Sequence, residues 1–239
     1  MSVLTRDDIL RYIQEDKISF RPGLDEFQLQ AHAVDLRLGF TFLVPKSWHV
    51  TKAGREPLHM DYYAPDRPEY FDIVELEQGQ FFDLLPGEHI LVSSLESLRV
   101  PDDLMAVMYP RSTTNRKGIS VDLTGIIDSG YEGQLVIPIR NNTQSQTVRL
   151  YPGERFCQIV FQGLSGASQP RLSRYHQRDI IEGVDVDSLE KGRKAEIELV
   201  MAGKIKELKA AHPAQPTAKA PQPVAKAPQP ARPKPAKKK

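Results

Sequence analysis

The pattern of apolar and polar positions in the first 40 residues predicts a short helix and then a strand. Apolar side chains recur at helical spacing within residues 5–13, and Thr5 with Asp8 resembles a capping box. In residues 34–39, VDLRLG, apolar and polar side chains alternate, which is the period of a β-strand. We therefore expect an N-terminal helical segment over residues 1–27 that leads into a sheet.

From Phe81 to Gly163 the pattern consists of short apolar runs that are separated by turns. Pro-Gly pairs stand at positions 86–87 and 152–153, and almost no helical spacing lies between them. Many short strands with such turns predict a mainly β fold, either a jelly roll or a distorted β-barrel. Residues 46–72 are polar, aromatic and proline-containing, so we expect them to form an insertion outside the main core.

The composition changes after residue 164, where we place the end of the β domain. Residues 165–186 are loop-like and basic, and they are predicted to form a connecting loop or a lid. Residues 187–211 predict a C-terminal helix, although Gly192 and Gly203 weaken it. Residues 212–239 contain mainly Ala, Pro, Lys and Gln, a composition that cannot bury apolar area, and we expect this tail to be disordered.

The bulk composition excludes several classes of protein. No apolar run approaches the roughly 18 residues that a membrane span needs. The single cysteine, Cys157, excludes an intrachain disulfide and a cysteine-rich zinc site. The N-terminus lacks the features of a secretion signal, so a cytoplasmic protein is expected.

The positive charge is concentrated at the C-terminus. Seven of the 32 basic residues lie in residues 212–239, which contain no acidic residue, so residues 1–211 carry 25 basic against 31 acidic side chains. The tail is predicted to be a solvated extension, with weak binding to nucleic acid as the alternative. An acidic body that binds polyanions must gather its positive charge locally.

The first segment whose side chains suit ligand binding is PRSTTNRKG, residues 110–118. It combines arginine, serine, threonine and lysine at the end of a predicted strand. Guanidinium groups, hydroxyls and backbone N–H groups suit phosphate oxygens. The alternative is a solvated basic turn.

The second segment is GIIDSGYEG, residues 125–133. Asp128 follows an apolar pair, and a partly buried carboxylate there could activate a water molecule. Tyr131 could lay its ring against a sugar. The alternative is a turn that Asp128 caps, with Tyr131 in the core.

The third segment is YPGERFCQ, residues 151–158, which by itself predicts only a hairpin with Arg155 and Gln158 as candidate polar ligands. The three segments in this order resemble motifs of the trimeric dUTPases and dCTP deaminases. VDLRLG resembles the deaminase form of a further motif of this superfamily, and the run from Leu85 to Thr113 is also deaminase-like. The resemblance covers roughly residues 1–164 and implies a dUTPase-like distorted jelly roll.

The resemblance also implies a role for each matched residue. Asp128 would be the catalytic base that activates water for attack on the α-phosphorus, and Tyr131 would pack under the deoxyribose. The hairpin that includes Gly125 and Ile127 would read the pyrimidine through backbone groups. The remaining substrate-binding residues would contact the phosphates: Arg111, Ser112, Thr113, Arg116 and, from an adjacent subunit, Gln158.

A cofactor and an assembly follow from the same resemblance. Mg²⁺ would bridge the phosphates of the substrate, a deoxypyrimidine nucleoside triphosphate. Asp35 could support the metal indirectly or support a subunit contact. The protein would be a homotrimer with active sites between subunits.

Position 138 bears on the choice between the two chemistries of the superfamily. dUTPases hydrolyse dUTP to dUMP and diphosphate, whereas dCTP deaminases use a glutamate-activated water at C4 of cytosine, without zinc. That glutamate lies ten residues after the aspartate of the motif, which is Pro138 here. Proline has no acid/base function, and it requires an edge or bulged strand.

We therefore predict a dUTP diphosphatase. The alternatives are a dCTP deaminase, a bifunctional deaminase and diphosphatase, and a catalytically degenerate nucleotide-binding protein.

Two departures from the superfamily pattern affect the predicted site. The Gly-rich arm that closes over the base in dUTPases is not visible, and residues 171–178, RLSRYHQR, are the best substitute lid. Tyr175 would stack on the base there; the alternative is a surface loop. Thr113, Thr114 and Asn115 replace the small apolar residues that usually follow the Arg-Ser pair, which would alter the phosphate pocket.

Overall fold

The computed structural model describes residues 2–61, 69–121, 125–167 and 191–211. The chain divides into two units, Met1–Leu189 and Glu190–Lys239, and each is described by itself. Within the described residues the helices are α1 (Arg6–Gln14), α2 (Ser112–Arg116), α4 (Lys191–Met201) and α5 (Ile205–Ala211). None of these helices is long and apolar enough to cross a membrane.

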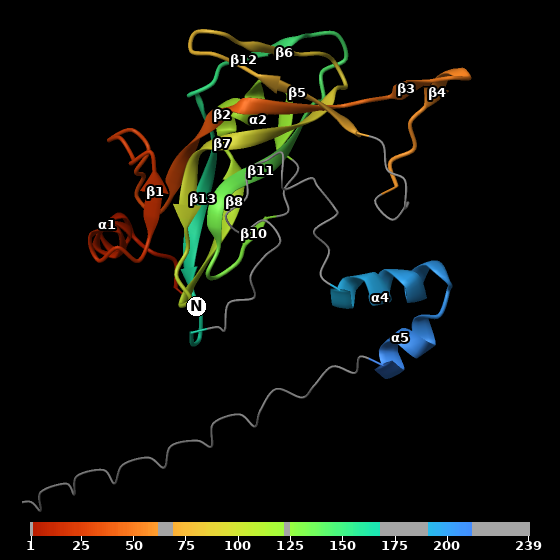
Figure 1. The fold of residues 1–239 in the computed structure, drawn as a ribbon. Helices are drawn as coiled ribbons and strands as arrows, with labels where there is room; N and C mark the ends of the chain where they lie inside the picture. Colours follow the sequence, from red (N-terminus) through yellow and green to blue (C-terminus); the bar gives the residue numbers. More distant parts are fainter. Residues whose placement is uncertain (1, 62–68, 122–124, 168–190, 212–239) are drawn as a thin grey trace, which may run out of the picture. The chain divides into compact units, whose positions relative to one another are not determined.

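The first unit is built on a curled sheet (Figure 1). Seven strands follow the order β10-β8-β13-β2-β7-β11-β9, while β1 pairs with β7 and β5 pairs with β2, all antiparallel. The strands of this sheet are β1 (Ser19–Arg21), β2 (Val34–Pro45), β5 (Phe71–Glu75), β7 (His89–Arg99), β8 (Leu104–Pro110), β9 (Ile119–Val121), β10 (Ile126–Ile127), β11 (Glu132–Asn141) and β13 (Arg155–Gly163). The predicted mainly β fold is confirmed, and its main sheet is curled.

Two short antiparallel ribbons accompany the curled sheet. The first consists of β6 (Phe82–Leu84) and β12 (Val148–Leu150). The second is a hairpin of β3 (Trp48–Thr51) and β4 (Gly54–Pro57), which extends away from the curled sheet in Figure 1. All four residues of β4 are exposed, and the Arg55 guanidinium lies 3.9 Å from the centre of the Trp48 ring. This hairpin lies within the segment that was expected to leave the main core.

The N-terminal helix begins at the predicted cap. The Thr5 hydroxyl accepts a hydrogen bond from the Asp8 backbone N–H, and the Asp8 carboxylate accepts one from the Thr5 N–H, at 3.3 and 3.2 Å. This capping box satisfies two backbone donors that the first turn leaves unpaired. Helix α1 buries Ile9 completely, so it contributes to the core of the first unit.

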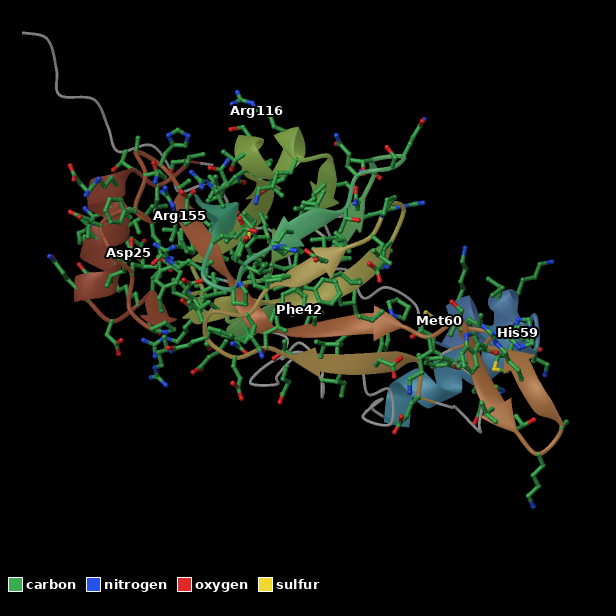
Figure 2. All side chains as sticks on the ribbon, turned by 90° about the horizontal axis from the view of Figure 1, so that it is seen from above. Asp25, Phe42, His59, Met60, Arg116 and Arg155 are labelled. Atoms are coloured by element: carbon green, nitrogen blue, oxygen red, sulfur yellow. The ribbon has the colours of Figure 1, made fainter. Side chains whose placement is uncertain are left out.

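The core lies inside the curl of the sheet. Val34, Leu36 and Leu38 are buried, as their alternation in β2 predicts. Phe42, labelled in Figure 2, stacks on Phe82 with ring centres 4.8 Å apart. The intervening polar residue Asp35 is also buried, with a relative exposure of 1%, although alternation alone would direct it to solvent.

In the second unit the structure has two helices within the segment that was predicted as one. Helix α4 ends at Met201, and α5 begins at Ile205. Gly203 between them has φ +69°, a left-handed conformation that terminates a helix and that glycine adopts at little cost. Residues 187–190 and the tail of residues 212–239 lie outside the described residues.

Candidate functional site

Two of the phosphate-binding residues predicted from the sequence, Arg111 and Gln158, lie where β2, β8 and β13 run side by side. Gln158 on β13 is opposite Asp35 on β2 and Tyr109 on β8, so one register aligns all three strands. Arg111 follows directly after β8, and its backbone N–H donates to the Phe156 carbonyl at 3.1 Å. Sheet pairing therefore brings residues far apart in the sequence to one edge of the barrel.

Asp35 forms ion pairs with two arginines at this edge. Its Oδ2 lies 3.2 Å from Arg111 Nε and 3.1 Å from Arg155 Nη1. The Asp35 side chain is 1% exposed, while those of Arg111 and Arg155 are 24% and 29% exposed. Burial raises the pKa of the Asp35 carboxyl above its ordinary value, and the neighbouring guanidinium groups partly oppose this. We call Asp35, Arg111 and Arg155 the arginine cluster.

The short helix α2 presents the hydroxyl and guanidinium groups next to this cluster. The Thr114 hydroxyl donates to the Phe156 carbonyl at 2.7 Å and is buried, which fixes the helix to β13. Ser112, Thr113 and Arg116 are exposed. Arg116 is labelled in Figure 2, apart from Arg155. Sequence analysis predicted a strand end or turn here, because five residues of mostly turn-forming type give little helical signal.

The predicted catalytic aspartate lies in a different part of the sheet. Asp128 follows β10, which pairs with β8 through Ile127 opposite Ala106. Its side chain is exposed rather than partly buried, and its backbone carbonyl accepts a hydrogen bond from the Tyr131 N–H at 3.2 Å. Gly125 has φ +71° and accepts a hydrogen bond from the Met108 N–H. This is a turn on the edge strand of the sheet.

Tyr131 packs in the core of the single chain. The residue is 8% exposed, and its hydroxyl donates to the Gln134 carbonyl at 2.6 Å. This placement corresponds to the alternative in which Tyr131 is a core residue. A sugar could contact only the small exposed part of the ring.

Within one chain, the arginine cluster and Asp128 lie toward opposite ends of β8. Asp128 lies beyond the Ile127–Ala106 pair, whereas Arg111 lies five residues after Ala106. Five extended residues span about 16 Å. A single chain therefore separates these two groups of the predicted site by more than the length of a hydrogen bond or a bridging water.

Pro138 lies in β11, opposite Leu91 of β7, and both residues are half-buried. The buried residues on either side, Ile137 and Ile139, point into the core, so Pro138 faces the opposite side of the sheet. The strand has a register shift between Gln134 and Val136, and its pairing with β9 begins only at Ile139. A side chain at position 138 is thus accessible from outside the barrel.

Behind the arginine cluster lies a network of buried polar side chains that the sequence analysis did not identify. The Gln28 amide donates to the Asp35 carbonyl at 2.9 Å and to Glu96 Oε1 at 2.7 Å. Glu96 is 1% exposed, and its Oε2 accepts a hydrogen bond from the Arg37 N–H at 3.0 Å. Burial raises the pKa of Glu96 above its ordinary value. For Asp35 and Glu96 the signal was a polar residue inside an otherwise apolar strand; Gln28 lies in a turn and gave none.

The predicted lid, a metal site and the hollows of the structure remain to be placed. Tyr175 and the rest of the predicted lid lie outside the described residues. Among the described residues, no three His, Cys, Asp or Glu side chains come together as a metal site would require. A hollow of about 690 Å³ lies beside the β3–β4 hairpin, and no predicted site residue lines it.

Comparison with known proteins identifies relatives over most of the chain. Residues 3–164 match the dCTP deaminase-like family. The chain is 37% identical over 183 residues to a "dCTP deaminase, dUMP-forming" of Dictyoglomus thermophilum, covering 74% of this chain and 90% of the relative. A protein with the same description from Methanosphaera stadtmanae is 36% identical over 170 residues, covering 71% and 83%.

A solved structure with similarity to the chain carries a related description. It is the 2′-deoxycytidine 5′-triphosphate deaminase of Agrobacterium tumefaciens, with a TM-score of 0.49 and 27% identity. The match covers 66% of this chain and 48% of that chain.

These relatives overturn the leading functional prediction. The sequence was interpreted as a dUTP diphosphatase because Pro138 replaces the glutamate of the deaminases. The relatives at 36–37% identity are instead described as dCTP deaminases that form dUMP. The prediction gave Pro138 more importance than the deaminase-like segments throughout residues 1–164, and that choice was wrong.

Proposed function

This chain belongs to the dCTP deaminase-like family, and from that premise we propose that it converts dCTP to dUMP. The balanced reaction consumes one dCTP and two water molecules and yields dUMP, diphosphate and ammonia. The observation that carries the proposal is the similarity to dUMP-forming dCTP deaminases, which extends over 83–90% of those relatives. The arginine cluster and Asp128 support it, because they supply groups suited to a triphosphate and to an attacking water.

The hydrolytic step is assigned to Asp128 and the phosphate-binding residues. Asp128 is exposed on a turn, where its carboxylate can take a proton from a water that attacks the α-phosphorus. Arg111, Ser112 and Arg116 would hold the phosphates, with Gln158 as a further polar ligand. Mg²⁺ would enter as the Mg–dCTP complex and be held by phosphate oxygens, since the described residues form no cluster of three metal-binding side chains.

Deamination must proceed with proline at position 138. Pro138 is accessible from outside the barrel, but its side chain cannot accept or donate a proton. We therefore propose that ammonia release is slower than it would be with a carboxylate at this position. The same observation favours a second candidate function, in which the protein binds dCTP and does not deaminate it.

The active site is proposed to form between subunits of a homotrimer. Support comes from the separation of about 16 Å between Arg111 and the segment that carries Asp128, estimated along β8. One subunit would contribute its arginine cluster and a neighbour would contribute Asp128. A closed ring of three identical subunits repeats this head-to-tail contact three times.

A panel of nucleotides tests the proposed function. Purified protein is incubated with Mg²⁺ and dCTP, dUTP, dTTP or CTP, and ammonia, diphosphate and monophosphate are measured separately. The proposal expects ammonia and dUMP from dCTP, and no ammonia from dUTP or dTTP. Turnover of dUTP with no turnover of dCTP would contradict it, and tight dCTP binding without ammonia release would favour the second candidate.

A further inference from the structure

The Asp35 carboxylate is placed to orient two guanidinium groups at once. Its Oδ2 accepts a hydrogen bond from Arg155 Nη1 at 3.1 Å and lies 3.2 Å from Arg111 Nε. Each arginine also donates to a backbone carbonyl. Arg111 Nη1 donates to the Arg155 carbonyl at 3.3 Å, and Arg155 Nη1, which contacts Asp35, also donates to the Phe27 carbonyl. Each guanidinium is therefore fixed on one side.

The other side of each guanidinium remains available to a ligand. Within the described part of the chain, neither Arg111 Nη2 nor Arg155 Nη2 has a protein hydrogen-bond partner. Two guanidinium groups and one carboxylate leave the arginine cluster with a net charge of +1. Partly exposed guanidinium donors with a net positive charge suit phosphate oxygens.

The Asp35 backbone is itself held at both polar groups. Its N–H donates to the Gln28 carbonyl at 2.8 Å, and its carbonyl accepts from the Gln28 side-chain amide at 2.9 Å. The same amide nitrogen donates to the buried Glu96. This arrangement restricts where the Asp35 carboxylate can lie, so it is a rigid support for the two arginines.

We propose that Asp35 is a positioning residue that holds Arg111 and Arg155 as a paired guanidinium clamp for the polyphosphate of the substrate. Arg155, which the sequence suggested only as a candidate polar ligand, thereby becomes a substrate-binding residue. The inference rests on the proposed function for the identity of the nucleotide, but the clamp itself requires only a polyphosphate. Asp35 acts through the arginines and does not contact the substrate.

The contacts of Asp35 also distinguish this role from support of a metal. The buried Oδ2 accepts hydrogen bonds from Arg155 and, at 3.3 Å, from the Gln30 amide, and it forms an ion pair with Arg111. A cation added beside this oxygen would lie next to two guanidinium charges, which repel it. The geometry thus fits an anion on the far side of the arginines better than a cation beside the carboxylate.

Calorimetric titration with three ligands tests the proposal on the full chain. The ligands are inorganic tripolyphosphate, dCTP and deoxycytidine, and the variants are Asp35→Asn and Arg155→Lys. Hydrogen bonds to charged groups have net energies that correspond to about 10- to 100-fold in affinity. We expect both variants to weaken tripolyphosphate and dCTP binding by about that factor and to leave deoxycytidine binding unchanged.

Asp25→Asn is the matched control, because it disrupts another carboxylate–arginine pair of the same region. Arg37 Nη2 lies 2.6 Å from Asp25 Oδ2, outside the arginine cluster, and Asp25 and Arg155 are labelled in Figure 2. This variant should bind all three ligands as the wild type does. If Asp35→Asn fails to fold, as judged by its thermal transition, Arg155→Lys carries the test alone, since the Arg155 side chain is partly exposed and lysine keeps its charge.

The outcomes separate this inference from the proposed function. Unchanged tripolyphosphate binding in Arg155→Lys, or an equal loss for deoxycytidine and tripolyphosphate, overturns the clamp. A wild-type protein that does not bind tripolyphosphate also overturns it. A protein that binds tripolyphosphate through the clamp and releases no ammonia from dCTP leaves the clamp supported and the proposed deamination contradicted.

Discussion

At the scale of single residues, Pro138 stands at the position where the resemblance to the deaminases predicts a catalytic glutamate. It stands on an accessible face of β11, so a carboxylate placed there can reach a ligand outside the barrel. We predict that Pro138→Glu raises the rate of ammonia release from dCTP by roughly 100-fold or more, since general-base catalysis typically contributes 10²–10⁴.

The matched control for this prediction is Pro138→Gln. Glutamine has the same size as glutamate and restores the same backbone N–H, but it cannot act as a base. A coupled assay for ammonia, with circular dichroism to verify folding, compares the two variants. Equal rates for Pro138→Glu and Pro138→Gln would show that a carboxylate at this position has no catalytic effect.

Glu96 gives a second residue-scale prediction, which concerns stability and pH. Burial raises the pKa of Glu96 above its ordinary value of about 4.5, so the folded protein binds this proton more tightly than the unfolded chain. The resulting contribution to stability is fully present below that value and is lost as the pH rises through the raised pKa.

Glu96→Gln removes this titration. In the wild type each Glu96 oxygen accepts from one donor, the Gln28 amide or the Arg37 N–H. In the variant the new N–H₂ group faces one of these donors and cannot accept its hydrogen bond, so the variant should be less stable. Urea unfolding between pH 4 and pH 8 measures the difference in unfolding free energy between the two proteins. We expect the wild-type advantage to shrink as the pH rises above about 4.5; an advantage that grows with pH would contradict the assigned direction.

At the scale of elements, the close approach of β2 and β7 depends on Gly39. A Cβ built on Gly39 would lie 2.1 Å from Ser93 Oγ and 2.9 Å from the carbonyl oxygens of Ser93 and Ser94. Two of these neighbours are backbone atoms that cannot turn away. Gly39→Ala should therefore destabilise the fold by about 1–3 kcal/mol or more through overpacking.

Gly23→Ala serves as the control for Gly39, because no heavy atom lies within 4 Å of a Cβ at Gly23. Thermal unfolding of both variants gives the comparison. A Gly39→Ala protein as stable as Gly23→Ala would show that the β2–β7 contact is looser than described.

Elements that depend on local sequence could be predicted well. The capping box of Thr5 and Asp8 and the strand at residues 34–39 appear in the structure where the sequence placed them. Helix α2 was missed because its five residues favour turns, and its stability comes from the Thr114 bond to β13, a distant segment. The C-terminal helix was predicted as continuous because a single glycine does not reveal its φ angle.

The candidate site was less predictable than the fold, because it depends on pairing between distant segments. The motifs identified Arg111 and Asp128, but the register of β10 on β8 determines that they lie far apart in one chain. Alternation directed Asp35 to solvent, whereas two arginines compensate its burial. The choice of chemistry failed because one residue, Pro138, was weighed too heavily.

At the scale of the whole molecule, the proposed intersubunit site predicts complementation between two inactive variants. Asp128→Asn lacks the base, and Arg111→Gln lacks the guanidinium charge but keeps donors for Asp35. In trimers assembled at random from an equal mixture, about a quarter of the sites combine an intact arginine with an intact aspartate. Turnover of dCTP should recover to about a quarter of the wild-type rate after co-refolding.

The controls for complementation are the two variants refolded separately, which should remain inactive. Native mass spectrometry verifies that the mixed assemblies form. If mixed trimers form and no activity returns, the two groups act within one subunit and the proposed arrangement of the site is wrong.

The most direct test of the central claim is the stoichiometry of products from dCTP. In one reaction with Mg²⁺, ammonia, dUMP and diphosphate are quantified over the same time course. The proposed conversion predicts that the three appear in equal amounts. Formation of dCMP and diphosphate without ammonia, or no product while dCTP remains bound, would contradict it.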